Sequence, residues 1–316
     1  MNELEVHLRK DIRLVRTEST FLVFVTAIIV ASVFMSYYAV LSYLQMGHSY
    51  PLINHGMMES NLRQTMLSFW TMAVNVIGLL LIVISASGFG SEKESGILRY
   101  TIAYGADARM MFLSKFLFLA FLAMVALIAS MAMFVVMISA SGSLPLDVGA
   151  FISSALVVYL QFLILISLGM VLSISMRKKS TAIVIAFVIM LGTAGISAYM
   201  EMDGYNAAQQ QFYLERYDGT VNFNNSFATE HFPLMNEVVM YMLPWKASSE
   251  AMSHSLGMAE REQLGNYDQV TFMSLEADVA VAALMCIGYL WAGYWLLSRD
   301  VTGRPGGTFL KGWHKK

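Results

Sequence analysis

The sequence predicts an all-α integral membrane protein, and three observations carry that prediction. The 316-residue chain is 57% hydrophobic and 13% charged, with a mean hydropathy of +0.59, whereas soluble domains carry about 25% charged residues. It contains several apolar runs of the length, about 20 residues, that a helix needs to cross a hydrocarbon core roughly 30 Å thick. Basic residues gather in alternate connections between these runs.

Six segments are long and apolar enough to be transmembrane helices. The first follows a charged N-terminus and is longer than the core of a signal peptide, so we expect it to be a retained span. All six are free of Asp and Glu. The predicted spans are Phe21–Leu44, Met66–Ser87, Met111–Ile138, Val148–Ile174, Thr181–Tyr199 and Val279–Leu297.

The positions of lysine and arginine predict the orientation of the spans. Of the 20 basic residues, 16 lie in the N-terminus, the second-to-third connection, the fourth-to-fifth connection and the C-terminal tail of residues 298–316. Cytoplasmic loops carry the excess of Lys and Arg. The sequence therefore predicts a multi-pass protein of the cell (plasma) membrane with both termini in the cytoplasm.

Residues 1–20 have the pattern of an amphipathic helix. Leu4, Leu8, Ile12 and Val15 share one narrow helical stripe, with most charges on the opposite side. Such a stripe favours a helix that lies in the interface of the inner leaflet. A solvated helix that leads into the first span is the alternative.

The connection between the fifth and sixth spans, residues 200–278, carries 12 acidic and 3 basic residues. Because a structureless loop of this length is uncommon, we expect an external acidic subdomain. Within it, residues 232–245 are apolar, too short to span and bounded by prolines. This stretch fits a re-entrant or interfacial helix, and a buried helix of the subdomain fits almost as well.

Several kinds of chemistry are disfavoured by the sequence. The spans lack the carboxylates that ion-coupled carriers use as relays. The chain has no phosphate-binding loop of the P-loop type, so it is not itself a P-loop ATPase. We predict no catalytic, cofactor-binding or metal-binding residues, and we interpret the 25 methionines as apolar filler.

A charged island, Ser91–Arg99, separates the second and third spans on the predicted cytoplasmic side. Charged residues would keep such a segment in water, while Ile97, Leu98 and Tyr100 would dock in a groove of a partner. Glu92 and Glu94 would pair with basic residues of that partner and set the register of docking. An ordinary solvated loop is the alternative.

This region resembles the cytosolic segment of type-2 ABC transporter permeases. In that family an acidic pair precedes Gly and an apolar dipeptide, an Arg follows, and a Lys opens the next span. The matching positions here are Glu92, Glu94, Gly96, Ile97, Leu98, Arg109 and Lys115. Ser114 departs from the family, which often has Gly there. We expect a cytoplasmic coupling helix between spans 2 and 3, within segment 88–110, and we assign ATPase coupling to Glu92, Glu94, Gly96, Ile97, Leu98, Arg99, Tyr100 and Arg109.

The resemblance implies the permease subunit of an ATP-driven transporter, with an exporter the expected direction. It implies two permease chains, as a homodimer or a related heterodimer, and separate cytoplasmic ATPase subunits that bind ATP and magnesium. The chain itself would be neither an enzyme nor a binder of nucleic acid, and its other contact is the lipid bilayer. The alternative is a membrane-anchored scaffold or sensor that acts through the external acidic subdomain.

Overall fold

The computed structural model describes residues 19–49, 55–98, 101, 107–140, 147–217, 233–244, 246–257 and 273–301. Every regular element in these ranges is a helix, and they contain no strand. The helices are α2 (Ser19–Ser49), α3 (His55–Glu94), α5 (Ala108–Ala140), α6 (Val148–Ser175), α7 (Lys179–Tyr217), α8 (Leu234–Tyr241), α9 (Lys246–Ser255) and α10 (Leu275–Val301).

The all-α prediction is confirmed, and each of the six predicted spans lies inside one helix. Among the described residues, five helical segments are long and apolar enough to cross a membrane: Leu62–Glu94, Ala108–Ala140, Val148–Ser175, Lys179–Gly204 and Leu275–Arg299. In α2 the corresponding apolar stretch is shorter, Thr26–Leu41. The protein is thus a multi-pass membrane protein, and the count of six spans stays a prediction. The predicted interfacial helix lies outside the described residues.

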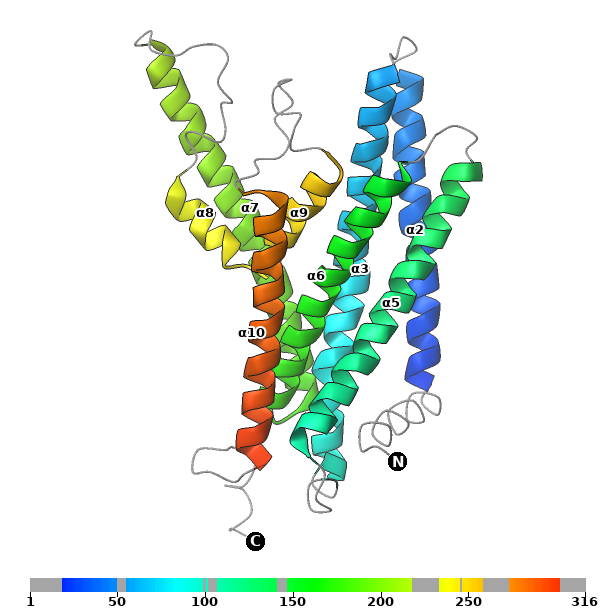
Figure 1. Ribbon diagram of the computed structural model, residues 1–316, viewed down its shortest axis with the longest axis vertical. Helices are drawn as coiled ribbons and strands as arrows, with labels where there is room; N and C mark the ends of the chain where they lie inside the picture. Colours follow the sequence, from blue (N-terminus) through cyan, green and yellow to red (C-terminus); the bar gives the residue numbers. More distant parts are fainter. Residues whose placement is uncertain are drawn as a thin grey trace.

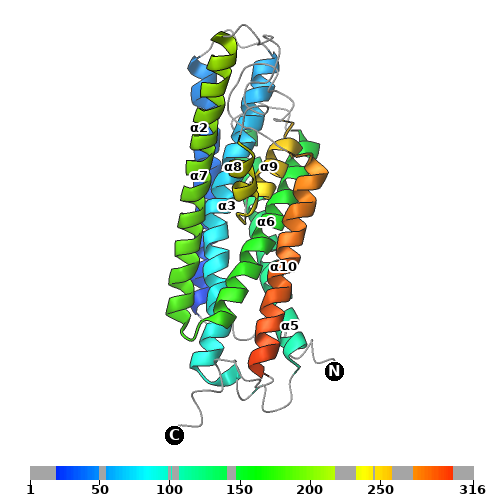
Figure 2. The same cartoon turned by 90° about the vertical axis from the view of Figure 1, so that its left-hand side faces the viewer.

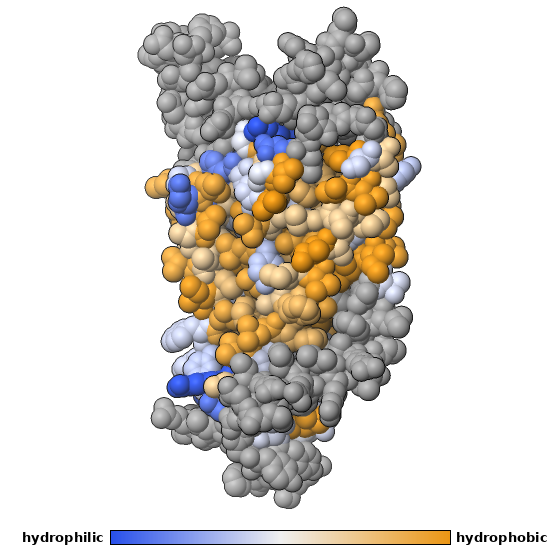
Figure 3. Space-filling view, turned by 45° about the vertical axis from the view of Figure 1, so that its right-hand side comes forward, coloured by the Kyte–Doolittle hydropathy of each residue, from blue (hydrophilic) through white to orange (hydrophobic). Residues whose placement is uncertain are grey.

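The long helices run roughly along one axis, with α3 and α6 at the centre (Figure 1). α2 and α5 pack on one side of α3, whereas α7 and α10 pack on the other side of the pair. In α6, 72% of the most apolar 18-residue stretch is buried inside the protein. The buried share of the corresponding stretch is only 17% in α7 and in α10. The outer faces of α7 and α10 are therefore left for lipid or another chain. Apolar side chains cover the middle of the face in Figure 3, with hydrophilic ones toward both ends.

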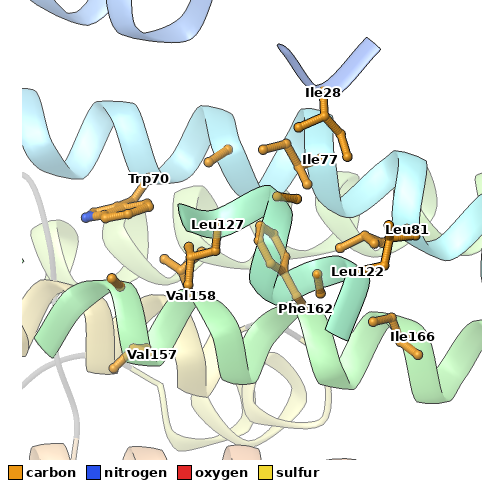
Figure 4. Close-up of a cluster of buried hydrophobic side chains, with 14 of the residues drawn as sticks. Ile28, Trp70, Ile77, Leu81, Leu122, Leu127, Val157, Val158, Phe162 and Ile166 are labelled. Carbon is orange, nitrogen blue, oxygen red and sulfur yellow. The ribbon is translucent and has the colours of Figure 1, made fainter. Parts of the chain in front are cut away.

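Aromatic and branched aliphatic side chains from α3, α5 and α6 fill the core, as Figure 4 shows around Trp70, Leu127 and Phe162. The Trp70 ring stacks on Phe151 at 5.2 Å between centroids, and its Nε1–H donates to Ser154 Oγ at 2.9 Å. In a membrane, close packing and interhelical hydrogen bonds replace the hydrophobic driving force between helices. These contacts fix the position of α3 against α6.

Two helices extend well beyond the predicted spans. α7 has 39 residues, which at 1.5 Å per residue corresponds to about 58 Å, roughly twice the hydrocarbon thickness. α8 and α9 follow within the predicted external segment. α8 contacts α7, and α9 packs against α6 and α10 in the half of the molecule away from the C-terminal end of α3 (Figure 1).

Replacing Gly169 with alanine is expected to destabilise the α3–α6 pair. A Cβ at Gly169 would lie 1.9 Å from Ser85 Oγ and 2.9 Å from the carbonyl oxygen of Ile82, and overpacking of this kind costs about 1–3 kcal/mol. The measurement is the melting temperature of the purified protein in detergent. Gly192→Ala is the matched control, because a Cβ there meets nothing within 4 Å. Equal melting temperatures of the two variants would contradict the proposed contact.

Candidate functional site

The charged island begins as the last turn of α3. Residues Ser91–Glu94 are helical, and a turn at Ser95 and Gly96 ends the helix. In this turn the Gly96 N–H donates to the Lys93 carbonyl at 3.2 Å, and Gly96 has a φ of 75°. This left-handed conformation favours glycine, which is typical of the residue that ends a helix. The acidic half of the island is thus rigidly continuous with a predicted span.

Glu92 pairs with Lys115 inside the protein. The Glu92 side chain is buried, and its Oε1 lies 3.0 Å from Lys115 Nζ. The Lys115 ammonium also lies over the Phe89 ring, 5.2 Å from its centroid. Buried charges in proteins are paired because desolvation of a lone charge is costly. The ion pair therefore joins the end of α3 to the first turns of α5.

Glu94 connects the same end of α3 to the start of α7. Its Oε1 accepts a hydrogen bond from the backbone N–H of Lys179, the first residue of α7, at 2.7 Å. A carboxylate at this place satisfies a free backbone donor and lies favourably in the helix dipole. Nearby, the Gly90 N–H donates to Ser173 Oγ at 2.9 Å, and Lys93 Nζ donates to the Ile174 carbonyl. The turn between α6 and α7 is therefore held against α3.

Arg109 connects the start of α5 to α10. Its Nε–H donates to the hydroxyl of Tyr294 at 2.8 Å, and its guanidinium lies 5.6 Å from the centroid of the Tyr294 ring. Its backbone N–H donates to Asp107 Oδ1 at 2.9 Å. Arg109 is otherwise exposed at this end of the molecule.

The apolar pair of the island is divided between core and surface. Leu98 is 2% exposed and belongs to the main core cluster, whereas Ile97 is 37% exposed. Leu98 is thus an internal anchor, and Ile97 presents an apolar side chain at the surface. Arg99 and Tyr100 lie outside the described residues.

The predicted coupling residues that the structure describes therefore lie at one end of the bundle, where α3, α5, α6, α7 and α10 meet (Figure 1). Three of them have partners within the chain that were not foreseen as partners: Lys115 for Glu92, Lys179 for Glu94 and Tyr294 for Arg109. Lys115 is one of the positions that match the permease segment, whereas nothing in the sequence around Lys179 or Tyr294 indicated a role for them at this site. These contacts make the segment a junction of five helices.

A second polar cluster lies at the other end, where α8, α9 and α10 meet. Lys246 Nζ lies 3.1 Å from Glu250 Oε1, and the Tyr241 hydroxyl donates to Glu250 and, at 2.9 Å, to Asp278 Oδ1. His254 Nε2 is 3.7 Å from Asp278 Oδ2. Burial and the hydrogen bond to Glu250 raise the pKa of the Tyr241 phenol well above its ordinary value of 10.0, so it remains a donor at physiological pH. We name these five residues the outer polar cluster.

The fold and this junction define an all-helical membrane protein whose long helices meet at one charged segment. A family model described as "ABC-2 family transporter protein" matches residues 7–300. The chain belongs to this family, and it is a permease subunit of an ABC transporter. No curated protein matches the chain. The family membership implies association with an ABC ATPase subunit and with the membrane.

Proposed function

We propose that the chain is the permease subunit of an ATP-driven exporter, coupled to separate ATPase subunits through segment 88–110. The observation that supports coupling best is the junction itself. The end of α3 is joined to α5 by Glu92 and Lys115 and to α7 by Glu94. A force applied to this segment would therefore move several spans together.

In this proposal Ile97 is the docking residue and the acidic pair positions it. Ile97 is exposed, while the neighbouring Leu98 is buried in the core. Ile97 lies in helical backbone directly after the turn at Ser95 and Gly96. An exposed apolar side chain in this rigidly held place suits an apolar groove of a soluble subunit. Glu92 and Glu94 hold this turn by contacts within the chain rather than by reaching the partner.

ATP and magnesium would be bound by the partner ATPase, since the chain carries no P-loop sequence. Two permease copies would form the translocation path, and the apolar outer faces of α7 and α10 offer surfaces for such pairing. On α8 the exposed residues Leu234, Met235, Val238 and Met242 form an apolar face that fits contact with lipid. This arrangement favours an interfacial or re-entrant placement of residues 232–245.

Ile97→Asp is expected to release the ATPase. A charge at this position would have to be desolvated in the partner's groove, and a loss of 1.4 kcal/mol already weakens binding about tenfold. The measurement is the amount of ATPase that co-purifies with the tagged permease from a co-expressing strain. Ser180→Asp is the matched control, because it adds the same charge at an exposed position in the first turn of α7, at the same end of the bundle.

Undiminished co-purification by the Ile97→Asp variant would contradict docking at this turn. A decrease of the same size in the Ser180→Asp variant would also contradict it, since that result would indicate a general effect of charge at this end. Normal yield and an unchanged melting temperature of both variants establish that the fold is intact. If an intact permease never captures an ATPase, the scaffold or sensor alternative gains support.

A further inference from the structure

A cavity of about 390 Å³ lies between α3, α6 and α7, beneath α9. Figure 2 shows α3, α6 and α7 side by side, with α9 next to the upper half of α6. Its volume is within the range of about 300–1,000 Å³ that is typical of small-molecule sites. None of the residues that line it belongs to segment 88–110, so it is distinct from the coupling junction.

The lining of the cavity is mainly apolar, with a few polar side chains. Val158, Leu191 and Met252 contribute apolar surface from three different helices. Asn75 on α3 and Gln161 on α6 contribute amides, and α9 contributes serine hydroxyls. Among the described residues that line the cavity, none carries a charge. The site therefore offers hydrogen bonds but no counter-ion.

Gln161 is the residue that points to a ligand. Its side chain is 2% exposed, and neither its Nε2 nor its Oε1 has a hydrogen-bond partner in the structure. A buried polar group without a partner costs about 1–3 kcal/mol, and most buried polar side chains have one. Because Gln161 lines the cavity, a molecule inside the cavity is positioned to supply the missing bonds.

We propose that this cavity binds an uncharged amphiphile whose amide or hydroxyl group bonds to Gln161. The glutamine amide offers both a donor and an acceptor, so it matches a group that does the same. A charged headgroup would be desolvated there without a counter-ion, which disfavours it. The apolar walls suit an alkyl or ring body. Such a molecule is either a membrane lipid or a transported compound, and both share this chemistry.

The test uses the full chain, purified in detergent without any ATPase, so its outcome does not depend on the coupling proposal. Radiolabelled dodecanamide is the probe, and dodecanoate, which has the same alkyl chain and a negative charge, is the comparison. We expect saturable binding of dodecanamide that raises the melting temperature of the protein. Dodecanoate is expected to bind at least about tenfold more weakly, which corresponds to 1.4 kcal/mol.

Gln161→Leu is expected to abolish saturable binding of dodecanamide. Without ligand the variant is expected to melt at the same temperature as the wild type or higher, because it removes two unpartnered polar atoms. A clearly lower melting temperature of the ligand-free variant would therefore also count against the proposal. Ser167→Ala is the matched control: Ser167 is a buried polar residue of α6 whose hydroxyl donates to the Ile164 carbonyl, and it does not line the cavity.

Equal binding by wild type and the Gln161→Leu variant, or tighter binding of dodecanoate, would overturn the proposal. If the Gln161→Leu variant loses binding as expected, a second experiment distinguishes a membrane lipid from a transported compound as the natural ligand. If dodecanamide stimulates ATP hydrolysis by the assembled transporter in proteoliposomes, the site belongs to transported compounds. If it binds and stabilises the permease without such stimulation, the site holds a lipid.

Discussion

Replacing Lys246 with methionine is expected to cause one of the two largest losses of stability in the chain. The Lys246 side chain is 8% exposed, and its ammonium lies 3.1 Å from Glu250 Oε1. The Glu250 and Asp278 carboxylates, both buried, share the Tyr241 hydroxyl as a donor. Methionine keeps the apolar stem but removes the positive charge, and breaking a buried ion pair in this way costs about 3–5 kcal/mol. The measurement is the melting temperature in detergent at neutral pH.

The loss in the Lys246→Met variant is expected to shrink as the pH falls. Burial and the Glu250 charge raise the pKa of the Glu237 carboxyl on α8, so the folded chain binds a proton there more tightly than the unfolded chain. Stability then decreases as the pH rises. Removal of the Lys246 charge leaves the neighbouring carboxylates less compensated at high pH, so the variant is expected to lose more stability than the wild type as the pH rises.

Lys178→Met is the control for the Lys246 prediction. Lys178 is exposed in the turn between α6 and α7, at the opposite end of the molecule. Its replacement should change the melting temperature little, since exposed charges contribute about 0–1 kcal/mol. A Lys246→Met protein as stable as the wild type would contradict a buried cluster. A difference in melting temperature between the variant and the wild type that grows as the pH falls would contradict it as well.

The long apolar helices were predictable because local hydropathy marks each of them along the sequence. A run of about 20 consecutive apolar residues is typical of a transmembrane helix. All six predicted segments fall within helices. The full helix lengths were not predictable in the same way. α3 begins at His55 and α7 continues to Tyr217. Beyond the membrane a helix is no longer made of consecutive apolar residues, so hydropathy does not show where its helical backbone ends.

The location of the charged island at the end of a predicted span was predictable, but its contacts were not, and the coupling role assigned to it stays a prediction. Charge density and the recognised pattern located Glu92 and Glu94, and both lie at the helix junction. The partners of Glu94 and Arg109, however, are 85 and 185 residues away along the chain. Such pairing depends on which helices are neighbours, which a single sequence does not encode locally. For the same reason the outer polar cluster appeared in the sequence only as part of an acidic segment.

Glu92→Gln is the second prediction with a large expected effect. The Glu92 carboxylate is buried, and its ion pair with Lys115 joins α3 to α5 at the helix junction. Glutamine keeps the shape but removes the charge that stabilises the Lys115 ammonium, for an expected loss of about 3 kcal/mol. Glu94→Gln is the matched comparison: Glu94 is exposed and caps α7, so its loss should be about 1 kcal/mol. Melting temperatures of both variants check the order.

A double variant distinguishes the effect of the ion pair on the stability of the fold from its effect on stimulation of the ATPase. Replacing both Glu92 and Lys115 with leucine removes the pair, and apolar replacement of a buried ion pair is often neutral for stability. We expect its melting temperature to recover relative to the Glu92→Gln variant. If the pair also sets the orientation of the Ile97 turn, permease-dependent stimulation of the co-expressed ATPase stays low despite this recovery. Recovery of both would confine the ion pair to folding, whereas a Glu92→Gln protein as stable as the wild type would contradict the pair itself.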